Sequence, residues 1–267
     1  MTHTIEQQMR DLGQPDLTEP GFEEPARMYV AIVEQLRDDL NPTDLRQVSD
    51  ALDVAWMLHH GQFRASTTIP YITHPLSNVQ RLVEHGVRDP EVLAAGALHD
   101  SVEDCHHEWA THVGFVATEE DPAAREEQER AVLQHAIDVR FGEETGRIVA
   151  GVTNEVRKAP SQSREESNVA FVAHARTKIM ASFGVFAVKW VDYLDNAGTL
   201  AQAKFADQTR KVRLAQKYLP MGEAFGEAKA HHESAGTFNL PKLGVEMVES
   251  ELARIQGDLE GILASAA

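Results

Sequence analysis

The stretch from Leu93 to Cys105 constrains this chain most, because it joins an apolar helical run to a cluster of ionisable groups. Residues 89–91 (Asp-Pro-Glu) just upstream are typical of a helix start, with a capping Asp and Pro at the first helical position. Residues three and four apart share a helix face, so Asp100 shares one with Glu103 and Asp104. Carboxylates gathered beside an imidazole at the end of a buried helix repel one another and resist desolvation. A cation would compensate them, so the stretch predicts a metal site.

The remaining sequence also predicts helices. Asn41-Pro42 opens a helix that runs to Gly61 with apolar residues at three- and four-residue steps. No strand-like alternation persists, and no Gly-rich phosphate loop is present, so the expected fold class is all-α. Residues 1–20 are expected to be a flexible arm, and residues 220–267 a helical C-terminal extension. Further helices are expected at 22–40, 74–86, 121–140, 144–152, 169–181, 185–200 and 201–218, with a loop over 153–168.

Composition excludes several classes of function. The net charge of −17 argues against general binding to nucleic acid or to an anionic membrane, although a few local cations can still hold a small phosphorylated ligand. There is no apolar run of about eighteen residues, and the N-terminus does not resemble a secretory signal, so we expect a cytoplasmic protein. Cys105 is the single cysteine and is expected to be a small buried thiol rather than a metal ligand.

Candidates for the remaining metal ligands lie on two other predicted helices. His59 continues the inward stripe of the helix that opens at Pro42, and Asp192 lies on the 185–200 helix with Asn196 one turn beyond it. An adjacent His-Asp pair such as His99-Asp100 is common by chance. Spacing alone therefore leaves a metal site and an ordinary buried hydrogen-bonding cluster equally open.

Five segments, in chain order, resemble motifs of the metal-dependent HD phosphohydrolases. More narrowly, they are similar to the hydrolase domain of the RelA/SpoT family and its stand-alone relatives, the small alarmone hydrolases. Together they cover roughly residues 45–200. The segments are His59–Arg64 (His-x-Gly-Gln-x-Arg), Pro70–Pro75 (Pro-Tyr-Ile-x-His-Pro), Leu98–Asp104 (Leu-His-Asp-Thr-Val-Glu-Asp), Phe141-Gly142 followed by Val149–Thr153 (Phe-Gly and Val-x-x-Val-Thr) and Lys189–Asn196 (Lys-x-x-Asp-x-x-x-Asn).

The resemblance implies an HD-domain helical bundle over residues 21–219, with an insertion at about 106–140. It implies one divalent cation, typically Mn²⁺ with other divalent metals possible. The implied ligands are His59, His99, Asp100 and Asp192. Glu103 and Asp104 are then expected to position and deprotonate the attacking water, and Asn196 to hold substrate or water near the metal. Candidate substrate-binding residues are Arg64, Tyr71, Lys158 and Lys189, of which Tyr71 either stacks on a nucleobase or simply packs; His74 is expected to be a structural hydrogen bonder near the site.

The activity implied by the resemblance is hydrolysis of the 3′-pyrophosphate of (p)ppGpp to GDP or GTP. The loop at 65–69 is one residue longer than usual and lacks the usual Gly, so a second hypothesis keeps the site but changes the nucleotide to an adenine alarmone or to the 2′-phosphate of NADPH. A third hypothesis is a non-catalytic binding module, motivated by the acidic surface and the 220–267 extension. The expected partner is a small phosphorylated nucleotide, and the oligomeric state is left open.

Overall fold

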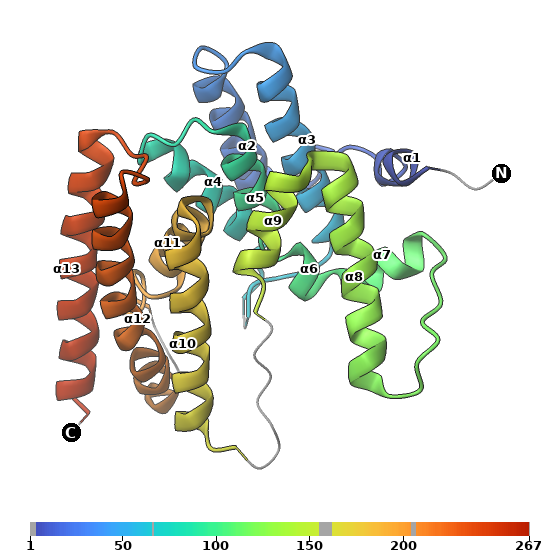
Figure 1. Ribbon diagram of the computed structural model, residues 1–267. Helices are drawn as coiled ribbons and strands as arrows, with labels where there is room; N and C mark the ends of the chain where they lie inside the picture. The colour runs from blue at the N-terminus through green and yellow to red at the C-terminus, as the bar shows by residue number, and fades with distance from the viewer. Residues whose placement is uncertain (1–3, 66, 155–161, 204–206, 267) are drawn as a thin grey trace. The chain divides into compact units, whose positions relative to one another are not determined.

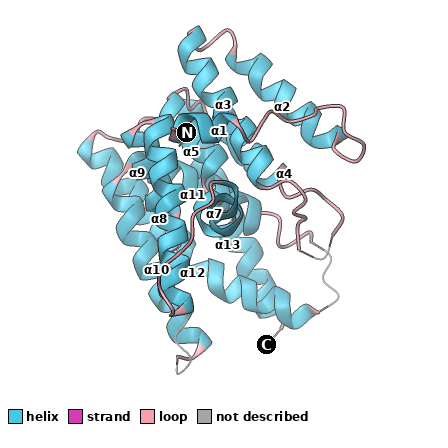
Figure 2. Ribbon diagram, turned by 90° about the vertical axis from the view of Figure 1, so that its right-hand side faces the viewer, coloured by secondary structure: helices cyan, strands magenta, loops and turns pink. Residues whose placement is uncertain are grey.

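The computed structural model describes residues 4–65, 67–154, 162–203 and 207–266, and Figure 1 traces their helices along the chain. Two compact units divide the chain, one formed by residues 1–83 and 88–153 and the other by 84–87 and 154–267. Among the described residues only helices, turns and one isolated β-bridge are found, as Figure 2 shows by colour. The all-α prediction is therefore confirmed. None of these helices is both long enough and apolar enough to cross a bilayer.

The first unit contains nine helices in its described residues, and local chemistry sets several of their starts. The side chains of Asn41, Asp89 and Asp121 each accept backbone N–H groups at the first turn of the helix that follows, and each is succeeded by Pro, as predicted. The helices are α1 (Ile5–Arg10), α2 (Glu23–Leu36), α3 (Pro42–Leu58), α4 (Thr73–Glu84), α5 (Pro90–Leu98), α6 (Ser101–Asp104), α7 (His106–His112), α8 (Pro122–Phe141) and α9 (Glu143–Val152).

Helix α5 is the centre of the first unit. Every residue from Val92 to Leu98 is buried, and the helix packs against α3 and α9. Gly96 lets α4 approach closely, because a Cβ added there would lie 2.6 Å from Leu82 Cδ1 and 3.6 Å from Val79 Cγ2. The end of α5 is thus tightly packed on several sides, and the ionisable residues that follow it are attached to a rigid part of the core.

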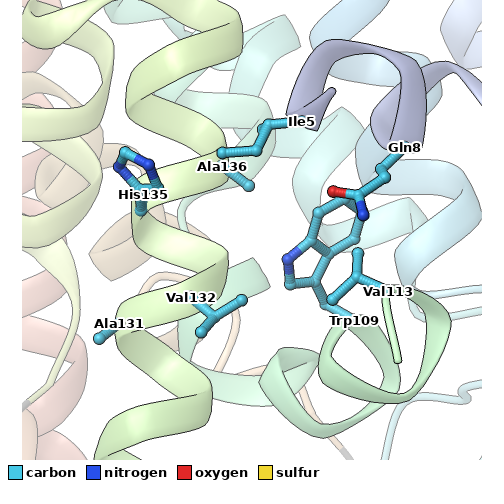
Figure 3. A pocket seen from close by; sticks show the side chains of 8 residues that line it. All are labelled: Ile5, Gln8, Trp109, Val113, Ala131, Val132, His135 and Ala136. Carbon is cyan, nitrogen blue, oxygen red and sulfur yellow. The ribbon is translucent and has the colours of Figure 1, made fainter. Parts of the chain in front are cut away.

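Part of the expected N-terminal arm is ordered. Residues 5–10 form α1, which is capped by Thr4 and packs against α8, with Met9 only 2% exposed. Burial of this apolar side chain offsets the entropic cost of ordering a short helix. An apolar pocket of about 300 Å³ lies between α1, α7 and α8. Figure 3 shows Trp109 and Val132 among the side chains that line it.

In its described residues, the second unit contains four long helices and the short segment 84–87. Helix α12 packs against α10, α11 and α13, and an aromatic cluster joins α11 to α12, with the Trp190 and Phe225 ring centroids 5.2 Å apart. His85 belongs to this unit, because its Nε2 lies 3.1 Å from Glu251 Oε2. The helices are α10 (Arg164–Ala181), α11 (Phe183–Asn196), α12 (Gln208–Ala235) and α13 (Lys242–Ala264).

Several helix boundaries in the second unit differ from the predictions: α11 ends at Asn196 instead of 200, and α12 begins at Gln208 instead of 201. Two other differences have a clear local cause. Helix α10 begins at Arg164, inside the expected loop, because Ser163 and Glu166 form a reciprocal capping box. Helix α12 runs through Pro220, so the residues after it continue a helix instead of starting a separate extension. Pro220 removes one backbone donor, but Met221, Ala224 and Phe225 are buried directly after it, and this packing sustains the helix.

Candidate metal centre

Short elements of the first unit carry the residues that the sequence singled out. His59 caps the end of α3, and the chain then turns through a loop closed by an antiparallel bridge between Phe63 and Pro70. Within this loop the Tyr71 backbone N–H donates to Gln62 O at 2.9 Å. Helix α4 follows immediately, and the end of α5 leads into α6. The loop and the two helix ends therefore deliver His59, Tyr71, His74, His99, Asp100, Glu103 and Asp104 to the first unit.

Three donor atoms converge within this unit, two from buried histidines and one from the half-buried Asp100. His74 Nε2 lies 3.2 Å from His99 Nε2, and Asp100 Oδ2 lies 3.4 Å from His74 Nε2 and 3.2 Å from His99 Nε2. The His74 and His99 side chains are 4% and 1% exposed, and the Asp100 side chain is 19% exposed. Two imidazole nitrogens and a carboxylate oxygen form a donor set suited to a divalent transition metal.

The hydrogen bonds around His99 prepare it as a ligand. Its Nδ1 lies 2.9 Å from the carbonyl oxygen of Gly96, which can only accept, so Nδ1 carries the proton. In the neutral imidazole Nε2 then keeps a lone pair directed at His74 and Asp100. Metal-binding histidines in proteins are commonly oriented in this way, with the second ring nitrogen donating to a backbone carbonyl. The residues present therefore fit a divalent cation.

Charges in the cluster shift the pKa values of its carboxyl groups in opposite directions. Burial alone would raise the pKa of Asp100, but His99 and His74 outweigh it and hold that pKa well below its usual range. Burial, with the neighbouring charges of Asp100 and Glu103, raises the pKa of Asp104 to about 6. Tyr71 adds a hydrogen bond, its hydroxyl donating to Asp100 Oδ2 at 2.6 Å. Asp100 is thus the anionic member of the cluster.

His59 lies beside this cluster, close enough to interact electrostatically with Asp100, His99 and His74. Its ring stacks on Tyr71, with centroids 4.8 Å apart, and its Nδ1 lies 2.8 Å from Gln62 Oε1 and 3.3 Å from Cys105 Sγ. Burial lowers the pKa of His59, so the ring is neutral. Cys105 is a buried free thiol, as predicted. His74, which the sequence predicted to be a structural residue, has its Nε2 within 3.4 Å of both His99 and Asp100, and the role of His59 as a ligand stays a prediction.

Asn78 was not singled out by any sequence pattern, yet it contacts the cluster. It lies one turn after His74 on α4, is 0% exposed, and its Nδ2 lies 3.2 Å from His99 Nε2. Its Oδ1 has no hydrogen-bond partner among the described residues. A buried amide is expected to use both of its polar atoms. The only sequence signal was a polar residue one helical turn after His74, between the buried apolar residues Leu76 and Val79 of α4.

The expected catalytic pair follows the cluster in α6. Glu103 is half-buried. Asp104 is exposed as a whole residue, although the protein around its carboxyl group still desolvates that group, and the Asp104 backbone N–H donates to Asp100 O at 2.8 Å. Arg64 is half-buried in the bridged loop, where its backbone N–H donates to Ile69 O. Glu103 and Asp104 thus follow Asp100 within one helical turn, which is the arrangement that their three- and four-residue spacing predicts.

The remaining candidates lie in the second unit, on one face of α11. Asn196 Nδ2 donates to Asp192 Oδ1 at 2.6 Å, and Lys189 Nζ lies 3.4 Å from Asp192 Oδ2. This arrangement matches the predicted one-turn spacing of Asp192 and Asn196. Lys158 lies outside the described residues.

Comparisons with known proteins agree with these motifs. A family model described as HD domain matches residues 51–220, which is more than half of the chain. A GTP pyrophosphokinase of Streptomyces antibioticus is 32% identical over 79% of this chain. Proteins named guanosine-3′,5′-bis(diphosphate) 3′-pyrophosphohydrolase are 29% identical over 62% of the chain in Aquifex aeolicus and 26% identical over 82% in Vibrio cholerae. The matched parts span only 21%, 20% and 24% of these three relatives.

Proposed function

The chain belongs to the HD-domain family, with relatives of the RelA/SpoT type, and on that premise we propose that it hydrolyses the 3′-pyrophosphate of guanosine alarmones. The observation that carries the proposal is the buried convergence of His74, His99 and Asp100, with the His99 tautomer fixed by Gly96. A donor set of this kind is costly to bury without a cation. The names of the two pyrophosphohydrolase relatives support the substrate class.

We propose His74, His99 and Asp100 as ligands of one divalent cation, with Asp192 as the ligand supplied by α11. Asp192 is included because its segment resembles the family motif, and Asn196 and Lys189 hold its carboxylate. Mn²⁺ is the proposed ion. When bound, the cation neutralises charge on the phosphoryl oxygens and lowers the pKa of a water. The His59 ring stacks on Tyr71, and the Tyr71 hydroxyl orients the Asp100 carboxylate by donating a hydrogen bond to it.

The proposed chemistry is a single displacement at phosphorus. Water attacks the phosphorus joined to the ribose 3′ oxygen, that P–O bond breaks, and pyrophosphate and GDP or GTP are released. Glu103 and Asp104 orient the water, and Glu103, one turn from Asp100, accepts its proton. Asn196 holds substrate or water, while Arg64, Lys158 and Lys189 bind phosphate oxygens. Tyr71 packs on His59 and hydrogen-bonds to Asp100, which supports a positioning role for it over stacking on a nucleobase.

A second candidate keeps the site and changes the nucleotide. Phe63 and Ile69 are 55% and 43% exposed on the bridged loop beside Arg64. Exposed apolar side chains next to a cation suit a nucleobase with attached phosphates. An adenine alarmone or the 2′-phosphate of NADPH is the alternative substrate. A non-catalytic binding module is the third possibility that the assay distinguishes.

The test is product-resolved hydrolysis of ppGpp with Mn²⁺ or with EDTA. Wild type is expected to release pyrophosphate and GDP only with metal, and Asp100→Ala to lose at least about a thousandfold in rate while keeping a cooperative melting transition. Asp38→Asn is the matched control, because Asp38 is a solvent-exposed carboxylate on the same unit. Turnover by Asp100→Ala equal to wild type would refute the proposed centre. Metal-dependent turnover of another nucleotide in place of ppGpp would favour the second candidate, and metal binding without turnover the third.

A ligand comparison accompanies this assay. His74→Gln is expected to weaken Mn²⁺ binding, measured by calorimetry, by at least about a hundredfold, whereas His59→Gln is expected to bind Mn²⁺ almost as wild type does. The opposite result would restore the ligand set implied by the motif.

A further inference from the structure

The pocket of about 300 Å³ between α1, α7 and α8 takes no part in the proposed hydrolysis, and all of its lining residues belong to the first unit. Ile5, Val113, Val132 and Ala136 give it apolar walls. Among the described residues that line it there is no Asp, Glu, Lys or Arg. Transfer of a charged group into such surroundings is costly, so the pocket suits a neutral molecule and disfavours a phosphorylated one.

Trp109 adds one buried polar group to these walls. The residue is 1% exposed, and its indole Nε1 has no hydrogen-bond partner among the described residues. Figure 3 shows the nitrogen-bearing edge of the indole facing α8 across the pocket. An indole N–H can only donate, and a buried donor without an acceptor is unfavourable. The pocket therefore offers a donor to a ligand that carries an acceptor.

The walls of the pocket are held in place before a ligand binds. Met9 is 2% exposed and anchors α1, and His112 Nε2 lies 3.0 Å from the carbonyl oxygen of Gln8, which ties α7 to α1. The Trp109 and His112 ring centroids are 5.5 Å apart, so the indole also packs on its own helix. Preformed walls reduce the ordering cost of binding.

Size and lining together favour an aromatic ligand. An apolar cavity of about 150 Å³ holds benzene, so a pocket of about 300 Å³ has room for two fused rings. The Trp109 indole and the His135 imidazole contribute rings to the walls, and aromatic pairs gain stacked or edge-to-face contacts beyond their buried area. His135 is exposed and Gln8 is half-buried, so the side of the ligand near them can stay in contact with water.

We propose that this pocket binds a neutral two-ring heteroaromatic molecule whose ring nitrogen or carbonyl oxygen accepts a hydrogen bond from Trp109 Nε1. The buried donor selects for an acceptor, and the apolar walls hold the remainder of the rings. The inference goes beyond the proposed hydrolysis and does not rest on it, because it needs neither the metal cluster nor turnover.

The experiment follows the indole N–H groups of the nitrogen-15-labelled full-length protein by NMR. The chain has three tryptophans, Trp56, Trp109 and Trp190, and their signals are assigned from single tryptophan-to-phenylalanine variants. The probes are quinoline, which carries an acceptor nitrogen, and N-methylindole, which has the same number of non-hydrogen atoms but no N–H and no acceptor lone pair. Quinoline is expected to move the Trp109 signal downfield and to leave the other two in place, whereas N-methylindole binds without that downfield shift.

Two variants locate the binding, each with a matched control. Trp109→Phe keeps an aromatic ring and removes the N–H, so quinoline should bind about fivefold more weakly while N-methylindole binds as before. Trp56→Phe is its control, because Trp56 is also 1% exposed and its Nε1 likewise has no partner in the part of the chain that the structure describes, yet it does not line the pocket. Val132→Phe places a larger side chain in the pocket and should weaken binding of both probes at least about tenfold, whereas Val139→Phe, at an exposed position on the same helix, should not.

The wild-type titration decides the proposal even if Trp109→Phe does not fold, because the Trp109 signal is then identified by elimination. The proposal is overturned if quinoline at millimolar concentration leaves that signal unmoved, or if Val132→Phe and Val139→Phe bind quinoline equally. It is also overturned if the Trp109 signal moves with protein concentration alone and quinoline has no effect, because a second copy of the chain then covers the pocket.

Discussion

Replacing Asn78 by Leu is expected to have opposite effects on the metal-free and metal-bound protein. Among the described residues, the buried Asn78 Oδ1 has no hydrogen-bond partner, and Asn78 Nδ2 makes one hydrogen bond to His99. An unsatisfied buried acceptor costs about 1–3 kcal/mol, and a hydrogen bond contributes about 1 kcal/mol. Leu has nearly the same shape and removes both. The free energy of unfolding in EDTA should therefore stay unchanged or rise by up to about 2 kcal/mol.

In the metal-bound form the same substitution should be harmful. The two ends of a side-chain amide exchange on rotation by a half-turn, so Asn78 can present its oxygen where Nδ2 now faces His99. Loss of such a supporting group weakens metal binding about 10–100-fold. At a Mn²⁺ concentration one hundred times the dissociation constant, wild type gains about 2.7 kcal/mol, or roughly 5–10 °C in Tm. Asn78→Leu at the same Mn²⁺ concentration should lose about 1.3–2.3 kcal/mol of this gain.

The assay is urea denaturation in EDTA and in Mn²⁺, with calorimetric Mn²⁺ titration of each protein. Asn78→Asp provides the complementary variant, because a carboxylate in the same shape should increase the stability gained from Mn²⁺. The reasoning is refuted if Asn78→Leu is destabilised by more than about 2 kcal/mol in EDTA while its gain from Mn²⁺ equals that of wild type. That outcome would make Asn78 a purely structural residue.

Two further substitutions test the packing and the electrostatics of the first unit. Gly96→Ala should lower the free energy of unfolding by about 1–3 kcal/mol and weaken Mn²⁺ binding, because the added Cβ meets Leu82 on α4. Gly257→Ala is the control: the space around Gly257 is open, so this variant should be neutral or stabilising. Thermal melts and Mn²⁺ titrations of both variants test this. Burial raises the pKa of Asp53, with Asp50 adding to the effect and the Tyr29 hydrogen bond opposing it. A carboxyl group with a raised folded-state pKa contributes stability that is present below its ordinary pKa of 3.8 and lost as pH rises through the folded-state value. Asp53→Asn should therefore lose less stability than wild type between pH 4 and pH 7, and parallel pH profiles in urea denaturation would contradict this.

Capping residues in the sequence predict many of the helix starts, and the errors in the predicted boundaries also arise at particular local segments. Helix starts at Asn41, Asp89 and Asp121 were recognisable because cap and proline occur together within two residues. The start of α10 was missed because its capping box lies in a segment whose Arg and Lys residues resemble a solvated loop. The sequence predicts a helix break at Pro220, but α12 continues through it. Whether a proline breaks a helix depends on how the following residues pack, and sequence spacing carries no information about that packing.

His59 and His74 illustrate that helical periodicity does not determine how close a side chain lies to a site formed by other helices. Both residues lie at the ends of helices that face the same core, and a helical period fixes a direction around the axis but no distance between helices. His59 lies just after the last turn of α3 at φ −90°, and its ring turns toward Tyr71 and Cys105. His74 lies in the first turn of α4, on the far side of the Phe63–Pro70 bridge. The bridged loop, whose conformation depends on pairing between residues seven apart, therefore sets how His59 and His74 are placed around His99 and Asp100.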